Sequence, residues 1–356
     1  MAMQNFALTP GRINKFKGQI LAHAVPMECL GRTGRQVPMP KNQSDTYVAR
    51  RWLPYGATAT NASSQNQFFQ NGTGDRGNVI VQAHQVQEGV TPAPDSIVPL
   101  DITVVMQQYS CLYGFTDKTY DLYEDDIPKA MIEQVGERVT FVNEMIIYGA
   151  LRACTNQYFG GGGTTIGTVA GPLTLNLVRN VAKGLQANHA GMTNKMLKAG
   201  PDFGTDAVSE GFCVYGHTDL EPDIRDMPGY TPIERYASGK PIDNEVGKVE
   251  RFRFVTSPDL PSVQNAGAAV GSTGCYSTSG SNIDVYQLVI CGADAWSQLA
   301  VRGLEALDPV MMLPSERSKA DPLGQRGYFG TQWWKAILLE NQGWMAILNV
   351  GVRTLT

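Results

Sequence analysis

The segment FCVYGHTDLEPDIRDMPGYTPIERYASGKPIDNEVGKVERFRFVT, residues 212–256, reads either as a chemical site or as part of a framework. Within ten positions it gathers five side chains that can bind a metal or transfer a proton: His217, Asp219, Glu221, Asp223 and Asp226. A metal or catalytic site needs such groups to converge, commonly at positions i and i+4 of a helix. Pro222 interrupts the segment, so we expect the carboxylates to point in different directions. The segment therefore predicts a framework.

A short helix gives a simpler explanation for these acidic residues. Thr and Asp are favoured at helix N-caps, and carboxylates in the first turn are stabilised by the helix dipole. We therefore expect Thr218 or Asp219 to cap a helix, and we predict a protein that is not an enzyme, with no catalytic residue, cofactor or metal. The alternative from another class is a soluble metal-dependent hydrolase that uses His217, Asp219 and Asp223.

The chain after this segment has the patterns of strands and loops. Residues 212–215 and 285–296 are apolar runs typical of buried strands, and residues 249–256 alternate as a strand does. Two further apolar runs flank the turn residues 341–343. They predict a terminal β-hairpin over residues 330–352.

The best helix pattern covers residues 125–154. Apolar or small residues recur at spacings of 4, 3, 4 and 3: Val135, Val139, Val142, Ile146 and Gly149. Such a helix spans about 40 Å and must lay one apolar stripe on a sheet or on another helix. The glycine run 160–163 that follows lacks the Gly-Lys-Ser/Thr of a phosphate-binding loop and predicts a linker. Residues 173–198 predict one or two shorter helices.

The first third of the chain predicts an extended arm and a projecting hairpin. Residues 1–44 contain several prolines and no sustained period, whereas residues 46–53 and 97–110 have strand patterns. The polar tract between those strands has a turn signal at residues 71–72. Because an isolated two-stranded hairpin is marginally stable in water, we expect it to lie on another surface, such as a neighbouring subunit.

Composition limits the class of protein. The 356 residues are 42% hydrophobic and 17% charged, which predicts an ordered chain of roughly two domains. The net charge of −4 argues against a classical basic nucleic-acid binder. Residues 1–51 hold eight basic and two acidic side chains, a balance of +6, so the rest of the chain carries a charge of −10. A basic arm on an acidic body suits contact between subunits or weak contact with a polyanion; a solvated tail is the other interpretation.

The six cysteines are widely spaced and form no CxxC pair, which predicts reduced, buried thiols and a reducing compartment. No apolar run reaches the ~18 residues needed to cross a bilayer, and the N-terminus has no signal-peptide pattern. We expect no membrane contact.

Three segments, in matching order, resemble the major capsid proteins of tailed bacteriophages, in the family named for the coat protein of phage N4. The first is EGVTP at 88–92, followed by a strand ending in QQYS; the second is YGHTDLEPDIRDMPGYTPIERY with GKPIDNEVGKVERFRFVTSP, within 215–258. The third is DPLGQRGYFGTQWWKAILLENQGWMAILNVGV, at 321–352. NEVG at 244–247 departs from the family's more usual Gly-Glu start, and the Asn/Gln-rich insert at 56–87 is particular to this chain.

The resemblance implies an α+β protein with the HK97-like capsid fold, which herpesvirus shells share. Its expected parts are an N-terminal arm (1–44), an extended β-hairpin loop with the start of the peripheral sheet (45–110), a peripheral domain with a long spine helix (111–169), an axial domain (170–325) and C-terminal strands returning to the peripheral domain (326–356).

The resemblance also implies a function. The chain would be a coat protein that assembles with itself into hexamers and pentamers of an icosahedral head enclosing double-stranded DNA, built in the host cytoplasm. The expected partners are a separate scaffolding protein, a portal complex and weakly contacted DNA, with a decoration protein left open. A β-rich tail or decoration component would explain the hairpins but not the long helix.

Two expectations concern the hairpin. Arg50, Arg51 and Trp52 are our predicted inter-subunit contacts, because Arg and Trp are favoured interface anchors. Some proteins of this fold class join subunits by a Lys to Asn isopeptide bond through the projecting loop. There is no lysine between Lys41 and Lys118, so we predict no such bond through this loop.

Overall fold

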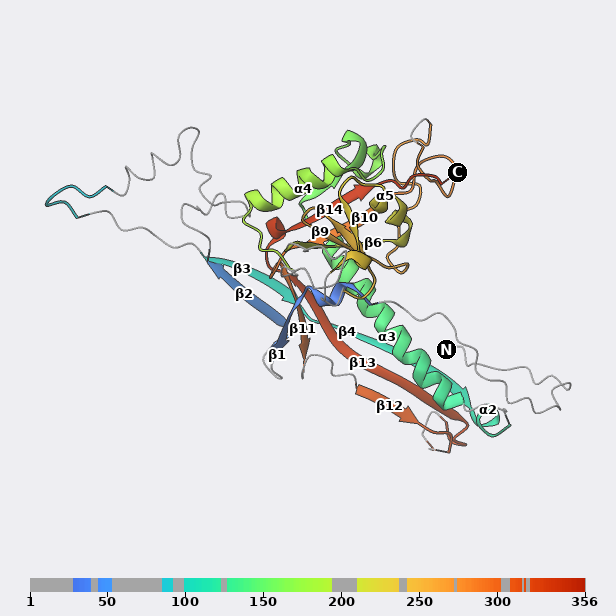
Figure 1. Ribbon diagram of the computed structural model, residues 1–356. Helices are drawn as coiled ribbons and strands as arrows, with labels where there is room; N and C mark the ends of the chain where they lie inside the picture. Colours follow the sequence, from blue (N-terminus) through green and yellow to red (C-terminus); the bar gives the residue numbers. More distant parts are fainter. Residues whose placement is uncertain are drawn as a thin grey trace.

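The structure is a computed structural model that describes residues 28–39, 44–52, 85–91, 99–122, 127–193, 210–236, 242–271, 274–301, 308–315, 317 and 321–355. Most of these residues belong to two large sheets, a two-stranded ribbon and a long helix. Figure 1 shows the ribbon on one side of the molecule and the helix running between the sheets. The α+β class is confirmed. Within the described ranges, no helix is both long enough and apolar enough to cross a bilayer.

The five-stranded sheet is built around one long strand, β13 (Arg326–Leu339). β4 (Gln107–Thr116) and β12 (Asp308–Met312) pair with overlapping stretches of β13 and therefore lie on its opposite sides. β11 (Trp296–Val301) pairs with the C-terminal end of β13, and β1 (Arg35–Met39) runs parallel to β11. The arm thus joins a sheet formed mainly by the last third of the chain.

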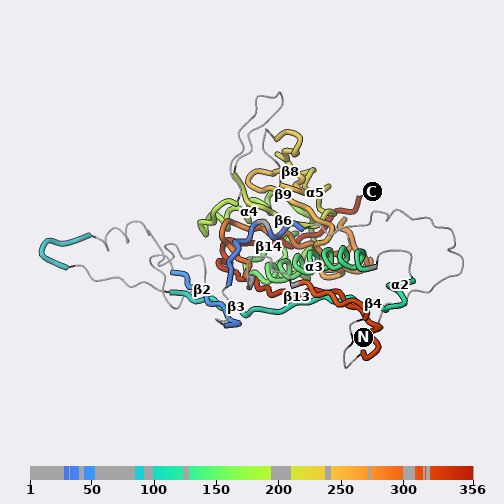
Figure 2. Tube along the Cα trace, turned by 90° about the horizontal axis from the view of Figure 1, so that it is seen from below, coloured from blue at the N-terminus to red at the C-terminus, as the bar shows by residue number. Residues whose placement is uncertain are grey.

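The helix predicted over residues 125–154 is α3 (Ile127–Arg152). Figure 2 shows it lying along β13. Its first half packs on the five-stranded sheet through one apolar cluster, formed by Met131, Val135, Val139, Cys111, Phe115, Phe329 and Trp333. The short α2 (Asp117–Leu122) precedes it.

The predicted apolar stripe of α3 is wrong in its second half. Gly149 is exposed, whereas Ile147, Tyr148 and Leu151 are buried. These three residues belong to a second cluster, which also contains residues of the seven-stranded sheet. Because α3 passes from one sheet to the other, its buried face changes along its length, which a single repeat cannot represent.

The seven-stranded sheet has the order β5-β14-β10-β6-β9-β8-β7. Its strands are β5 (Gln157–Phe159), β6 (Phe212–Gly216), β7 (Tyr230–Pro232), β8 (Glu245–Val249), β9 (Phe252–Thr256), β10 (Tyr286–Cys291) and β14 (Met345–Val350). In β10, Leu288 and Ile290 pack on the side of α4 (Leu175–Ala187), while Val289 and Cys291 pack with the end of α3. Both faces are covered, which explains continuous apolar runs rather than alternation.

The single strand predicted over residues 97–110 is wrong, because its described part, from residue 99 onward, belongs to two strands. β3 (Pro99–Val105) pairs with β2 (Thr46–Trp52), whereas β4 pairs with β13. The break is at Met106, whose side chain is buried between the ribbon and the five-stranded sheet and whose amide donates to the Asp45 carbonyl at 2.8 Å. The chain changes sheets at this residue.

The predicted terminal hairpin is also wrong. The side chain of Asn341 accepts a hydrogen bond from the Gly343 amide and caps a short 3-10 turn, η7 (Gln342–Trp344). After this turn β14 enters the seven-stranded sheet between β5 and β10, while β13 stays in the other sheet. All six residues of β14 are buried, which suits a strand covered on both faces rather than the second strand of a surface hairpin.

Several expected segments lie partly or wholly outside the described residues. The arm is described only at 28–39, where it forms η1 (Leu30–Arg32) and β1. The turn at 71–72 and most of the insert at 56–87 lie outside. The expected one or two helices of 173–198 include α4, and residues 194–198 lie outside.

Candidate assembly surface

The ribbon β2–β3 is held at its base by its own subunit. Thr46 pairs with Val105 and Trp52 with Pro99 in antiparallel register. The inner face of the ribbon packs on the five-stranded sheet through Tyr47, Ala49, Ile102 and Val104, against Met39, Met106, Leu299, Ala336 and Leu338. The sheet fixes the direction in which the ribbon leaves the body.

The opposite side of the ribbon, which we call the outer face, carries the exposed side chains of Val48, Arg50, Trp52, Pro99, Asp101, Thr103 and Val105. Val48, Trp52 and Val105 are 54%, 59% and 47% exposed. Large apolar side chains with this exposure, grouped on one ribbon, are typical of a contact surface.

Arg50 is engaged within its own chain. Its Nε and Nη2 atoms donate to the two carboxylate oxygens of Asp101, at 2.7 and 2.9 Å. This hydrogen bonding raises the pKa of Arg50 and lowers the pKa of Asp101. The pair leaves a locally neutral patch between Val48 and Trp52.

Arg51 lies on the inner side of the ribbon and connects it to the end of β13. Its Nη1 donates to the Glu340 carbonyl at 3.1 Å, and burial lowers the pKa of Arg51 despite the opposing effect of Glu340. The carboxylate of Glu340 accepts from Arg35 of β1 at 2.9 Å. Glu340 thus links the arm, the ribbon and the five-stranded sheet.

The acidic residues around His217 divide among three partners, and two of them share one arginine. Asp219 accepts from the Tyr286 hydroxyl at 2.7 Å, and Glu221 pairs with Arg225, also at 2.7 Å. Asp223 is 2% exposed and pairs with Nε of Arg353 at 3.0 Å. Asp226 pairs with Nη1 of the same arginine at 3.2 Å. Burial raises the pKa of Asp223, and Arg353 opposes this shift.

The ion pairs of Arg353 with Asp223 and Asp226 attach the C-terminal segment to the acidic segment that follows His217. In the described part of the chain, no group of three or more His, Cys, Asp or Glu side chains could hold a metal ion. The expected divergence of the carboxylates is confirmed, and the geometry does not favour the hydrolase alternative. The expected cap is wrong in its residue: His217 rather than Thr218 or Asp219 caps the turn, because its Nδ1 accepts from the Asp219 amide at 3.0 Å.

The sequence did not reveal the partners of the predicted contact residues. Asp101 would follow from the antiparallel register if the ends of both strands were known, because Arg50 and Asp101 are directly opposite. Glu340 has no local signal, since it is 289 residues from Arg51 along the chain.

Comparison with known proteins gives one related sequence and many related structures. No family model matches. The major capsid protein of Pseudomonas phage KPP21 is 21% identical over 182 residues, which is 48% of this chain and 46% of that protein. The chain therefore matches about half the length of this curated relative.

Three solved structures illustrate the similarity in three dimensions. The capsid of Ralstonia phage GP4 gives a TM-score of 0.63 at 10% identity and covers 100% of both chains. The capsid of cyanophage P-SCSP1u gives 0.57 at 11% identity, with 96% of this chain and 93% of that chain covered. The capsid of Helicobacter pylori bacteriophage KHP30 gives 0.57 at 9% identity, with 98% and 100% covered.

Proposed function

Because the chain has the HK97-like capsid fold, we propose that it is the major capsid protein of a tailed bacteriophage. Copies of it would form the hexamers and pentamers of an icosahedral head that encloses double-stranded DNA. The extent of the structural similarity carries this proposal, since alignments to phage capsids take in nearly the whole chain, including the ribbon and α3. The role is structural rather than enzymatic; the protein resides in the virion capsid and assembles in the host cytoplasm.

Within this fold we place the chain in the N4-type coat protein family. The three resembling segments support this assignment. The second of them supplies the end of β6 and all of β7 to β9, and the third supplies β13 and β14, so together they form parts of both sheets.

The division into an arm (1–44), a hairpin loop (45–110), a peripheral domain (111–169), an axial domain (170–325) and C-terminal strands (326–356) remains part of the proposal. The five-stranded sheet with the first half of α3 corresponds to the peripheral domain, and the seven-stranded sheet to the axial domain. The latter sheet also takes in β5 and β14 from the flanking segments.

The outer face of the ribbon is our proposed contact with the neighbouring subunit. Its base is fixed on its own sheet, and its apolar side chains are exposed. Trp52 is the central anchor in this proposal. Arg50 acts as part of its pair with Asp101, and Arg51 supports the contact by anchoring the ribbon to Glu340.

Replacing Trp52 by Ala is expected to weaken assembly while leaving the stability of the unassembled chain nearly unchanged. The side chain is 59% exposed, so the free energy of unfolding of the unassembled chain should change by less than about 0.5 kcal/mol. A buried interface anchor contributes more than 1 kcal/mol, so the concentration needed for assembly should rise roughly tenfold. Light scattering against concentration measures this, with Leu355→Ala, 75% exposed in the C-terminal segment, as the control. An unchanged threshold for Trp52→Ala would exclude Trp52 as an anchor.

We also propose that assembly uses a separate scaffolding protein and a portal complex, and a decoration protein is left open. Contact with packaged DNA is weak and independent of sequence. The charge of −10 outside residues 1–51 supports this, because a strongly basic wall would retain DNA that must be ejected.

The shell is expected to lack Lys to Asn crosslinks through the hairpin loop, because there is no lysine between Lys41 and Lys118. Mature heads boiled in denaturant should therefore migrate on a gel as single chains of 38.7 kDa. A ladder of covalent oligomers that persists under reducing conditions, with peptides from residues 45–110 at the junction, would refute this.

Sedimentation velocity and negative-stain electron microscopy of the purified chain, with particles from a phage lysate as the reference, test the proposed function. Capsomers or shell-like particles support it. A stable monomer with bound metal would favour the hydrolase alternative instead, and tubes or rings would favour a tail component.

A further inference from the structure

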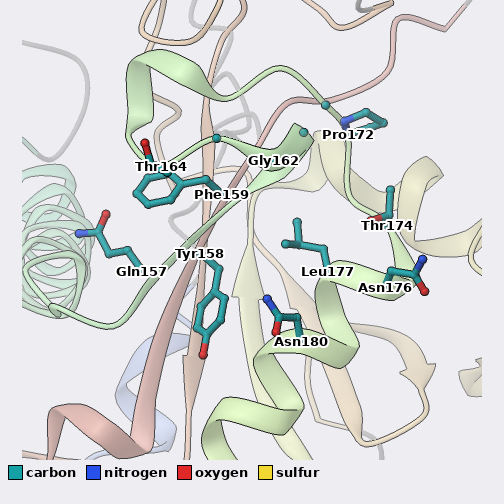
Figure 3. Close-up of a pocket in the computed structure, with 13 residues that line it drawn as sticks. Gln157, Tyr158, Phe159, Gly162, Thr164, Pro172, Thr174, Asn176, Leu177 and Asn180 are labelled. Atoms are coloured by element: carbon teal, nitrogen blue, oxygen red, sulfur yellow. The ribbon is translucent and has the colours of Figure 1, made fainter.

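A charge-free cleft of about 940 Å³ lies between the glycine run, β5 and the start of α4. Figure 3 shows Tyr158 next to Asn180, with Pro172 and Thr174 farther across the cleft. None of the 13 residues that line it is charged. Its polar groups are amides and hydroxyls, and Phe159 and Leu177 supply apolar surface.

Glycine backbone forms part of the cleft wall, and at Gly161 it packs closely on the segment at Gly171. Gly161 and Gly162 have φ angles of +73° and +79°, which favour glycine, and a Cβ on Gly161 would lie 2.8 Å from the Gly171 nitrogen. Among the described residues, β5 is an edge strand of the seven-stranded sheet and pairs with β14. Edge strands offer backbone donors and acceptors to an extended peptide, and amide side chains bind peptide groups well.

The lining offers no charged side chain to a ligand. It lacks both the cationic side chains that strengthen the binding of phosphates and carboxylates and the anionic side chains that attract cations. The cleft has neither, so its chemistry fits a neutral, amide-rich peptide with some aromatic character.

The chain itself contains such a peptide. Residues 53–74, LPYGATATNASSQNQFFQNGTG, which we call the neutral tract, hold no charged residue and place Phe68 and Phe69 between glutamines. The other long uncharged loop outside the cleft, at 261–283, is already hydrogen-bonded within its own subunit, for example between Val263 and Val285. We propose that the cleft binds the neutral tract of a second copy of this chain, an inference that rests on the proposed assembly.

The position of the neutral tract supports a second copy as its source. The tract follows directly after Trp52, where β2 ends, and Figure 1 shows the ribbon directed away from the body of its own subunit. At about 3.3 Å per residue, 22 extended residues span up to roughly 70 Å, enough to reach a neighbour in a shell. Binding in the cleft would attach the neutral tract to a neighbouring subunit, whereas the base of the ribbon is held by the five-stranded sheet of its own subunit.

Cysteine crosslinking tests this arrangement, since all six native cysteines are buried. One chain carries Asn176→Cys in the cleft, and a size-tagged chain carries Gln67→Cys in the neutral tract. After coassembly and mild oxidation, particles should yield a mixed disulfide dimer on a non-reducing gel, and the unassembled mixture should not. Gln186→Cys, exposed on α4 outside the cleft lining, replaces Asn176→Cys as the matched control and should give at least tenfold less dimer.

Two outcomes would overturn the proposal. One is particles of normal yield with no more dimer than the Gln186→Cys control. The other is an intramolecular crosslink in unassembled chains carrying both cysteines, which would mean that each subunit fills its own cleft. Where Asn176→Cys prevents assembly, Thr174→Cys, which also lies in the cleft lining, serves as the probe. Failure of the unsubstituted chain to form particles would instead count against the proposed function.

Discussion

Replacing Arg253 by Ala is expected to lower the free energy of unfolding by about 3–5 kcal/mol. Arg253 and Glu245 form an ion pair between β8 and β9, with side chains 5% and 0% exposed. Glu245 also accepts from the Tyr236 hydroxyl at 2.8 Å and from the Ile242 amide at 2.9 Å. Without Arg253 the carboxylate of Glu245 stays buried beside these neutral donors and loses the positive charge that Arg253 supplies, which is costly in a medium of low polarity.

The matched control is Arg179→Ala. Arg179 pairs with Glu250 on the surface, with side chains 55% and 36% exposed, and such pairs contribute at most about 1 kcal/mol. Urea denaturation of both unassembled variants measures the difference. Similar losses of unfolding free energy for the two variants would show that the buried Glu245–Arg253 pair contributes no more to stability than a surface pair.

Glu144→Ala is expected to release the arm from the spine helix. Glu144 is 2% exposed on α3, and its Oε1 accepts from the amides of Cys29 and Leu30, at 3.1 and 3.0 Å. Each buried amide left without an acceptor costs about 1–3 kcal/mol. Hydrogen exchange at Leu30 should therefore become at least roughly tenfold faster. Glu133→Ala, an exposed site on the same helix, should leave that rate unchanged.

The pH dependence gives a second test of Glu144. Burial raises its pKa above the ordinary 4.5, and the amides of Leu30 and Cys29 oppose this. With the folded-state pKa above that of the unfolded chain, the stabilisation is complete below the unfolded pKa and is lost as pH rises through the folded pKa. Glu144→Gln keeps an acceptor oxygen but does not titrate, so it should retain arm docking and flatten stability above pH 4.5. An equally steep profile in both proteins would contradict this assignment.

The parts of the fold set by local pattern could be predicted from the sequence. The alternation in residues 46–53 predicts that Val48, Arg50 and Trp52 share one face, and these three side chains do lie on the exposed side of β2. The long helix was predicted to within two residues at each end. Both features depend on neighbours along the chain.

Features set by distant contacts could not be predicted. The break at Met106 and the separation of β13 from β14 depend on which sheet each strand joins. Glu144 is a buried acidic residue outside the predicted apolar repeat of α3, and its role depends on amides about 115 residues away. For the contact surface, the residue types were informative, whereas the partners Asp101 and Glu340 required the tertiary structure.

Cryo-electron microscopy of particles formed by the purified chain tests the central claim most directly. We predict closed icosahedral shells of hexamers and pentamers, in which the outer face of each β2–β3 ribbon packs on a neighbouring copy and Trp52 is buried. A homogeneous monomer, or an assembly without icosahedral order, would contradict the claim that this chain is a capsid protein.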